Sequence, residues 1–205
     1  MSREYVLASG NQGKLREMVR LLQPLGLLLR PQSEWQVPEA DESAGTFIEN
    51  ALIKARHAAR ITGLPAIADD SGLVVPALDG APGIFSARYA GSSADSQANM
   101  RKLLMEMETQ PGIDRRAYFF CAVVLLETAD DPAPLLATAR WHGRILTAPQ
   151  GSGGFGYDPV FAVGDSQLSA AELDGDEKQL VSHRGQALRK LLKKMQDRAA
   201  ARSDN

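Results

Sequence analysis

The chain has 205 residues, of which 44% are hydrophobic and 23% charged, and its formal net charge is −2. This globular composition with a slight acidic excess argues against a protein whose main task is to bind nucleic acid, and a single cysteine excludes a disulfide framework or a cysteine metal site within the chain. With no stretch of membrane-spanning length and no signal-peptide pattern, we expect a cytoplasmic protein that does not act at a membrane.

Apolar periodicity predicts the elements of the first part of the chain. In chain order these are a strand at 5–8, a helix at 14–23, a strand at 25–30, a polar and acidic loop at 32–45, and a helix at 46–62. Thr46 and Glu49 fit a capping box at the start of the last helix, and Gly63 ends it.

The later part of the chain contains more strands than helices. The pattern predicts a strand at 64–68 that runs into Asp69-Asp70, a strand at 73–78, a glycine-rich loop at 81–93, a helix at 95–108, strands at 118–127 and 135–142, a glycine-rich loop at 151–158, a strand at 160–163, a helix at 182–201 and a frayed end at 202–205. The two long strands flank Asp130-Asp131-Pro132 and are expected to form an antiparallel hairpin. Alternation early and antiparallel pairing later indicate an α/β protein with a mixed sheet.

The segment that ends in Asp69-Asp70-Ser71-Gly72 is the first candidate site. Two adjacent carboxylates at the end of a buried strand are costly unless a cation or a reacting group compensates them. Side chains alternate along a strand, so Asp69 and Asp70 would face opposite sides if the strand extends that far. The alternative is an ordinary polar turn formed by Asp-Ser-Gly.

The strand-to-helix loop Ser9-Gly10-Asn11-Gln12-Gly13-Lys14 is a candidate anion site. Free backbone N–H groups and the positive end of a helix dipole attract phosphate, and Lys14 adds a full charge. The loop is too short for a Walker A motif and has Leu15 where that motif needs Ser or Thr. The alternative is a glycine-containing turn with a solvated lysine.

Acidic residues near the second predicted helix are candidate metal ligands. Asp70, or Asp69, could hold Mg²⁺ together with Asp41 or Glu42, because Mg²⁺ is usually bound by few carboxylates, water and substrate phosphates. A carboxylate here could also accept a proton from an attacking water. The capping box already accounts for Glu49.

Two further segments could contact a ligand. In the loop Gly151–Pro159, four glycines surround Phe155 and Tyr157, so the backbone could approach a flat ligand while an aromatic ring stacks on it; otherwise these rings fill the core. Lys178 and Ser182-His183-Arg184 could donate hydrogen bonds to a base or a phosphate, or they could be a helix cap followed by solvated charges. The later cluster Arg189, Lys190, Lys193 and Lys194 is interpreted as a solvated helix face.

Taken in order, these segments resemble one known family, and the match extends from Val6 to about Leu192. The segments that carry the resemblance are Ser9-Gly10-Asn11-Gln12-Gly13-Lys14, Thr46-Phe47-Ile48-Glu49-Asn50-Ala51, Ala68-Asp69-Asp70-Ser71-Gly72-Leu73, Gly80-Ala81-Pro82-Gly83, Ser86-Ala87-Arg88-Tyr89, Gly153-Gly154-Phe155-Gly156-Tyr157-Asp158-Pro159 and Ser182-His183-Arg184. The sequence resembles the inosine/xanthosine triphosphate pyrophosphatases, which remove non-canonical purine nucleotides before they enter DNA and RNA.

The resemblance implies a fold, an activity and an assembly. The fold would be a single domain over residues 1–205, with a long mixed β-sheet flanked by helices and two lobes with the active-site cleft between them. The activity would be Mg²⁺-dependent hydrolysis of ITP, dITP and XTP to the monophosphate and pyrophosphate. The protein would be a homodimer, for which the loop at 83–93 is a candidate interface.

The resemblance also implies a role for each matching residue. Ser9, Asn11 and Lys14, with the rest of their loop, would hold the triphosphate. Asp70 would bind Mg²⁺ and act as general base, supported by Asp69, and Ser71 would touch the substrate. Phe155 would stack on the purine beside Gly156, Tyr157 and Asp158, and the side chains of Lys178, His183 and Arg184 would contact the nucleotide.

One departure from the family pattern leaves open which residue is the second metal ligand. The family shows Glu-Glu-Thr-Gly before the Thr-Phe of the second helix, whereas this chain has Asp41-Glu42-Ser43-Ala44-Gly45. Asp41 is the better match to the acidic metal position, and Glu42 remains the alternative. Two other functions stay open at this stage, a pyrophosphatase acting on other nucleotides and a non-catalytic nucleotide sensor.

Overall fold

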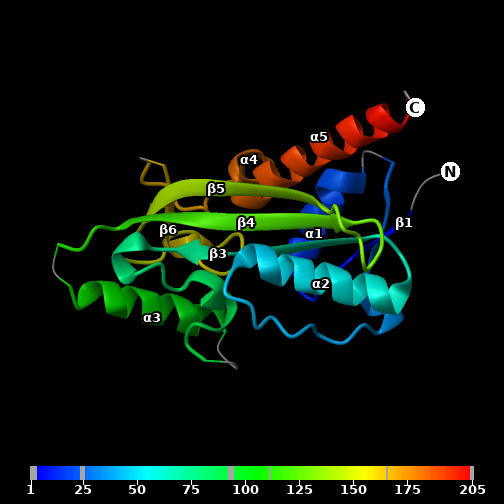
Figure 1. Ribbon diagram of the computed structural model, residues 1–205. Helices are drawn as coiled ribbons and strands as arrows, with labels where there is room; N and C mark the ends of the chain where they lie inside the picture. The colour runs from blue at the N-terminus through cyan, green and yellow to red at the C-terminus, as the bar shows by residue number, and fades with distance from the viewer. Residues whose placement is uncertain (1–3, 24–25, 92–94, 111, 165, 204–205) are drawn as a thin grey trace. The chain divides into compact units, whose positions relative to one another are not determined.

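The computed structural model describes residues 4–23, 26–91, 95–110, 112–164 and 166–203 (Figure 1). The helices are α1 (Gln12–Leu22), α2 (Phe47–Thr62), α3 (Ser96–Glu108), α4 (Gly175–Val181) and α5 (His183–Ser203). The strands are β1 (Glu4–Leu7), β2 (Leu28–Pro31), β3 (Ala66–Val74), β4 (Arg116–Leu126), β5 (Leu135–Ile145) and β6 (Phe161–Val163). Short 3₁₀ helices lie at 32–35, 76–78, 83–88 and 158–160.

The six strands form one mixed sheet in the order β2-β1-β3-β4-β5-β6. Strand β1 runs parallel to both of its neighbours, with Val6 opposite Arg30 on β2 and Ala66 on β3. Strand β6 pairs antiparallel with the end of β5, where Ile145 lies opposite Phe161. The α/β class with a mixed sheet is therefore confirmed, and β4 and β5 are neighbours, as the predicted hairpin requires.

The chain divides into two compact units. Unit 1 comprises residues 1–70, 121–139 and 184–205, and unit 2 comprises residues 71–120 and 140–183. Strands β3, β4 and β5 each contribute residues to both units. The one-domain boundary at 1–205 stays a prediction.

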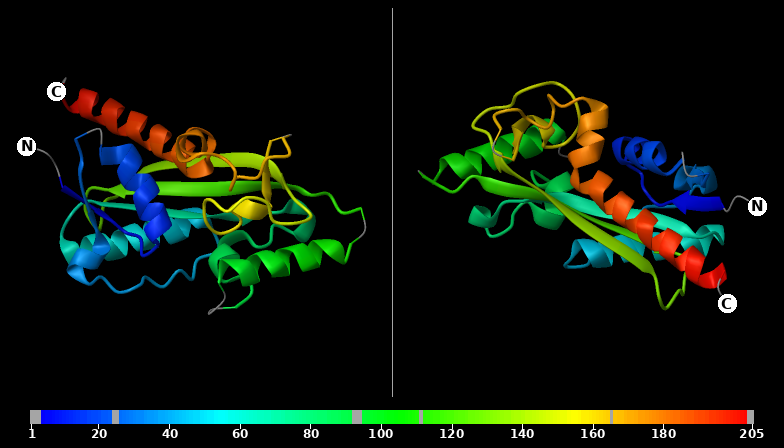
Figure 2. Two further views of the ribbon diagram at one scale, coloured as in Figure 1. Left: turned by 180° about the vertical axis from the view of Figure 1, so that it is seen from behind. Right: turned by 90° about the horizontal axis from the view of Figure 1, so that it is seen from above.

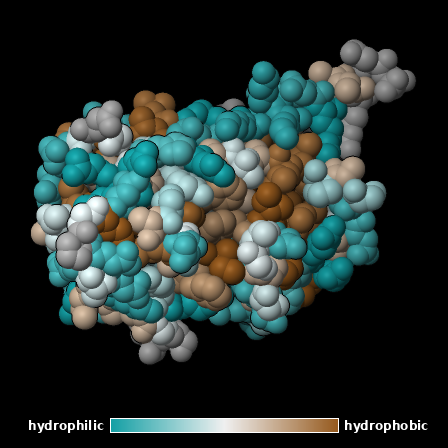
Figure 3. Space-filling model, turned by 60° about the vertical axis from the view of Figure 1, so that its left-hand side comes forward, coloured by the Kyte–Doolittle hydropathy of each residue, from teal (hydrophilic) through white to brown (hydrophobic). Residues whose placement is uncertain are grey.

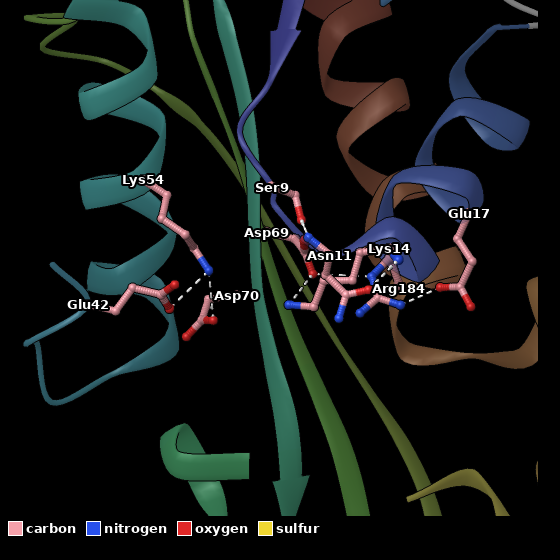
Figure 4. A network of polar contacts seen from close by, with 9 residues as sticks. All are labelled: Ser9, Asn11, Lys14, Glu17, Glu42, Lys54, Asp69, Asp70 and Arg184. Atoms are coloured by element: carbon pink, nitrogen blue, oxygen red, sulfur yellow. Dashed lines mark hydrogen bonds and ion pairs between the residues drawn. The ribbon is translucent and has the colours of Figure 1, made fainter. Parts of the chain in front are cut away.

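Unit 1 has apolar side chains on both faces of its strands. Leu7, Ile67 and Val123 belong to a cluster with Met18 of α1 and Leu188 of α5. The intervening strand residues are also buried, and four alanines of α2 are buried as well, which places α2 on the other face of β3 (Figure 4). Two-sided burial explains why these strands have continuous apolar runs instead of alternating ones.

Unit 2 has a core of its own that is rich in aromatic residues. Phe119, Trp141 and Phe161 pack in one cluster with Leu103 and Met107 of α3. The long β4 thus places Cys121 in the core of unit 1 and Phe119 in the core of unit 2.

The structure corrects several predicted boundaries. Strand β3 continues through Asp69-Asp70-Ser71-Gly72, so these residues are not a turn, and residues 76–78, predicted as strand, form a 3₁₀ helix. Helix α4 was not predicted, and the supposed loops at 32–45 and 81–93 contain short helices. Helix α5 extends to Ser203 rather than fraying at 202. Leu25, residues 92–93 and residues 204–205 lie outside the described residues.

A row of basic side chains on α5 reaches the backbone of β5 and the turn before it. Lys190 Nζ donates to Thr138 O at 2.9 Å, Lys194 Nζ donates to Leu136 O at 2.8 Å, and Arg198 Nη2 donates to Ala133 O at 2.7 Å. Figure 2 shows α5 running along the strands of unit 1. Lys190 and Lys194 are exposed, as the interpretation of a solvated helix face expects, and they additionally bind strand carbonyls.

The surface is mixed in polarity. On the face drawn in Figure 3, hydrophobic residues reach the surface among hydrophilic ones. The exposed large apolar side chains are Leu28, Ile61, Phe85, Met105, Leu168, Leu180 and Val181. Within the described residues, the helices are too short or too polar to cross a membrane.

Candidate active site

Strand β3 carries the two aspartates on opposite faces, as the alternation of side chains requires. In Figure 4, Asp69 points toward α1 and α5, whereas Asp70 points toward α2. Both carboxylates are largely withdrawn from water, with exposed fractions of 1% for Asp69 and 7% for Asp70. Because buried carboxylates need cationic partners, each aspartate makes its own set of ion pairs, Asp69 with Lys14 and Arg184 and Asp70 with Lys54.

Asp69 lies between two cations. Its Oδ2 is 3.2 Å from Lys14 Nζ and 3.2 Å from Arg184 Nε, and Arg184 also donates to Glu17. Burial by itself raises the pKa of Asp69, but Lys14, Arg184 and Lys54 outweigh it and hold this pKa well below its usual range. Asp69 is therefore ionised at neutral pH and holds Lys14 and Arg184 in place.

Asp70 has a different environment. Its Oδ1 accepts a hydrogen bond of 3.0 Å from Lys54 Nζ, which is also 3.1 Å from Glu42 Oε2. Burial raises the pKa of Asp70, Lys54 and Lys14 oppose this only in part, and Glu42 adds to the rise. A carboxylate with a raised pKa is a stronger base than an ordinary one, which suits a group that must accept a proton.

The loop before α1 has the geometry of a helix N-terminus. Asn11 is the N-cap of α1, and its Oδ1 accepts from Lys14 N at 3.1 Å, while Asn11 N donates to Ser9 Oγ at 3.2 Å. Gln12 and Gly13 are the first helical residues, and no acidic residue lies in the first turn. A Cβ at Gly10 would meet no atom within 4 Å, so the space beside this backbone is open. These features favour an anion.

Asp158 organises the glycine-rich loop of unit 2. It is 3% exposed, and its Oδ2 accepts from Phe155 N at 2.6 Å and from Lys178 Nζ at 2.6 Å. Lys178 Nζ also lies 4.9 Å from the centroid of the Phe155 ring. The carboxylate of Asp158 thus joins the aromatic residue to the lysine, although 20 residues separate Asp158 from Lys178.

Glycine is required at two places in this loop because of close contacts. A Cβ at Gly154 would lie 2.2 Å from Asp158 Oδ2, and one at Gly153 would lie 2.6 Å from Ala171 O. Gly154 also has a φ of +72°, which disfavours other residues. The loop is therefore a tightly packed structure that presents Phe155, whose side chain is half-buried.

The other predicted base-contacting residues lie deeper in unit 2. The Tyr157 hydroxyl donates to Ser86 O at 3.0 Å, and burial raises its pKa. The His183 ring is 6% exposed and stacks on Phe119 with ring centroids 4.8 Å apart. Tyr157 therefore anchors the loop. Ser71 follows Asp70 on β3 and is half-buried.

The structure thus groups the predicted residues into two sets. Unit 1 brings together Asp69, Asp70, Lys14 and Arg184 with the loop at 9–14, and unit 2 brings together Phe155, Asp158 and Lys178. Asp41 is exposed, whereas Glu42 reaches Asp70 through Lys54. In the part of the chain that is described, no three His, Cys, Asp or Glu side chains converge as a ready metal site.

Sequence reasoning did not identify Lys54 and Glu17. Lys54 lies on α2 among buried alanines, and its side chain is 14% exposed. A lysine on the apolar side of the predicted helix was therefore the one feature of the sequence that could have identified it. Glu17 follows Lys14 by three residues and therefore shares its helix face. Both residues lie outside the predicted motifs and form ion pairs with residues inside them, Lys54 with Asp70 and Glu17 with Arg184.

Comparison with known proteins assigns the chain to a family. A family model described as the Ham1 family matches residues 5–194. A dITP/XTP pyrophosphatase of Vibrio cholerae is 56% identical over 95% of this chain and 98% of its own length, and one of Pectobacterium atrosepticum is 56% identical over 91% and 95%. The solved structure of a HAM1 protein from Coxiella burnetii is 50% identical, with a TM-score of 0.89 over 95% of this chain and 99% of that one. The chain belongs to the Ham1 family.

Proposed function

We propose that this protein hydrolyses the non-canonical purine nucleoside triphosphates ITP, dITP and XTP to the monophosphate and pyrophosphate. The relatives named dITP/XTP pyrophosphatase support the reaction and the substrate class. The observation that carries the proposal is the pair of buried aspartates on opposite faces of β3, with Asp69 held between Lys14 and Arg184 and Asp70 paired with Lys54. Such a pair separates a fixed anion from a base, as hydrolysis by an activated water requires.

The triphosphate is assigned to unit 1. Cleavage between the α- and β-phosphates requires neutralisation of negative charge more than covalent catalysis. The N-terminus of α1, the Ser9 hydroxyl, the Asn11 amide and the Lys14 ammonium supply donors or positive charge for this purpose. Asp69 fixes Lys14 and Arg184, so both cations are positioned before the substrate arrives.

Magnesium is the proposed metal, and the donor set fits it. The Lys54 ammonium already lies within 3.1 Å of carboxylate oxygens from Asp70 and Glu42, so these oxygens converge on a cation. Asp70 would therefore hold the ion with Glu42, and the exposed Asp41 is the alternative second ligand. When bound, Mg²⁺ supplies neutralising charge to phosphate oxygens. Asp70 accepts the proton of the attacking water.

The purine is assigned to unit 2. Phe155 stacks on the base, and Asp158 fixes the backbone of Phe155 and the side chain of Lys178. Inosine and xanthosine present a 6-oxo acceptor and an N1–H donor, whereas adenine reverses both. Donors arranged for the 6-oxo edge therefore reject ATP, because its binding leaves buried groups unpaired.

The protein is also proposed to act as a homodimer in the cytoplasm. In unit 2, the 3₁₀ helix at 83–88 carries Phe85, which is 53% exposed, with Arg88 packed over its ring. An exposed aromatic residue beside an arginine is typical of interface anchors. Sedimentation equilibrium tests the assembly, and a monomer at assay concentrations would exclude it.

The experiment that tests the activity measures pyrophosphate release with Mg²⁺ from ITP, dITP, XTP, ATP and GTP. We expect release from the first three, the monophosphate as co-product and little turnover of ATP, whose adenine lacks the 6-oxo acceptor. Hydrolysis without base preference would refute the arrangement of donors for the 6-oxo edge. Binding without release from any triphosphate would refute the enzymatic proposal and favour a nucleotide sensor.

A further inference from the structure

Two aromatic rings of unit 2 lie nearly parallel to the imidazole of His183. The Phe119 ring on β4 is 4.8 Å from the imidazole, with an angle of 10° between the planes. Trp141 on β5 lies 6.3 Å from the imidazole at 16°, and 6.1 Å from Phe119 at 26°. All three side chains are buried, with exposed fractions of 5–7%.

The stack determines how His183 can form hydrogen bonds. The nitrogens of an imidazole bond in the plane of the ring, so the orientation of this plane decides where a donor points. The χ2 torsion of histidine has broad energy wells, and the side chain alone therefore does not fix the plane. Phe119 is the nearer of the two parallel neighbours and supplies a constraint, because offset parallel packing at this distance is a favourable arrangement of two rings.

We propose that Phe119 is a positioning residue for the reaction, which sets the plane of the His183 imidazole and thereby the selectivity for 6-oxo purines. This inference rests on the proposed function, because it assumes that His183 contacts the base. Phe119 itself does not touch the substrate; it acts through the imidazole. Its loss therefore changes purine binding and discrimination more than the chemical step.

The chain offers a matched control for this proposal. Phe161 is fully buried in the same cluster, at 4.7 Å from Phe119 and 5.2 Å from Trp141. Its ring is tilted by 56° and 54° relative to these two neighbours and so is not part of the parallel set. Phe161→Leu removes the same atoms from the same core as Phe119→Leu but leaves the parallel neighbour of His183 in place.

The first test is kinetic. Phe119→Leu is expected to raise the KM for ITP about fivefold or more and to lower the ITP-over-ATP preference, with kcat within about twofold, since only base contacts change. Phe161→Leu should keep both the KM and the preference, and Phe119→Tyr should behave as wild type because it keeps the ring. Equal changes in the two leucine variants, or no change in Phe119→Leu, would overturn the proposal.

The second test does not depend on activity. A ¹H–¹³C correlation spectrum resolves the imidazoles of the three histidines, and His183→Gln identifies the signal of His183. The face of Phe119 should shift the His183 ring protons upfield, and this shift should be lost in Phe119→Leu and kept in Phe161→Leu. If Phe119→Leu does not fold, Phe119→Met leaves a smaller void and serves in both tests.

The two tests separate the inference from the function on which it rests. A wild-type protein that fails to hydrolyse ITP refutes the proposed function, whatever the spectrum shows. A wild-type protein that hydrolyses ITP, together with a His183 signal that does not respond to Phe119→Leu, refutes only the positioning role.

Discussion

The Asp69→Asn variant tests whether the fixed anion of β3 stabilises unit 1. The Asp69 side chain is fully buried, and its partners Lys14 and Arg184 have side chains that are 15% and 2% exposed. Removing one partner of a buried ion pair costs about 3–5 kcal/mol, because the remaining charge loses its compensation. We expect a value near the lower end, about 3 kcal/mol, because Arg184 keeps Glu17 and Lys14 can still reach water.

Urea unfolding at pH 7 measures this loss, with Glu34→Gln as the matched control. Glu34 also pairs with an arginine, Arg30, but both side chains are about two-fifths exposed, at 39% and 42%. An exposed pair contributes at most about 1 kcal/mol. If Asp69→Asn were no more destabilising than Glu34→Gln, the argument that Asp69 holds buried cations would be refuted.

The destabilisation caused by Asp69→Asn should depend on pH. Because the folded pKa of Asp69 lies below its ordinary value of 3.8, the carboxylate contributes stability that is complete above that value and is lost as the pH falls through the folded pKa. The stability difference between wild type and Asp69→Asn should therefore persist from pH 7 down to about pH 4 and shrink only below it. A difference that disappears by about pH 5 would contradict the lowered pKa.

The remaining predictions concern turnover and substrate binding. Asp70→Asn should abolish pyrophosphate release while its circular dichroism and urea midpoint stay near wild type, and full activity would exclude Asp70 as the base. Lys14→Ala should weaken triphosphate binding by about 1.5–3 kcal/mol, the scale of a charge-assisted hydrogen bond, and calorimetry with a non-hydrolysable triphosphate measures it. Lys54→Met should move the acid limb of the pH–rate profile to higher pH, because Lys54 lowers the pKa of Asp70 and the deprotonated form of Asp70 is the active one. An acid limb that does not move would show that Lys54 does not control the ionisation of the catalytic base. Gly154→Ala should impair purine binding, since its Cβ would lie 2.2 Å from Asp158 Oδ2, and wild-type affinity for ITP would show that the loop yields without cost.

The sequence predicted those parts of the fold that depend on local pattern. Helix α2 was predicted within one residue because Thr46 and Glu49 cap it, with Glu49 N donating to Thr46 Oγ1 at 3.2 Å, and Gly63 ends it with a φ of +70°. Helix α4 was missed because its apolar residues, Leu180 and Val181, face solvent, whereas its buried side chain is Lys178. Apolar periodicity cannot reveal such a helix.

The motifs of the candidate site could be predicted from the sequence, but the ion pairs and hydrogen bonds between them could not. Alternation along β3 predicted that Asp69 and Asp70 would face opposite sides, and it required only that the strand continue past them. The partner of Asp70 could not be predicted, because Lys54 is 16 residues away on another element. Likewise, the resemblance implies that Asp158 lines the purine site, but it does not reveal that the Asp158 carboxylate accepts hydrogen bonds from Phe155 and Lys178.

The basic side chains on α5 that bind strand carbonyls also bear on aggregation of the protein. A strand carbonyl without a partner is an acceptor for the backbone of another chain, and rows of them template aggregation. Lys190 and Lys194 occupy the carbonyls of Thr138 and Leu136, and they place positive charge where a second strand would have to approach. We therefore expect a truncation that removes helix α5 to leave these two carbonyls open to another strand, and also to remove Leu188 and Leu191 from the core of unit 1.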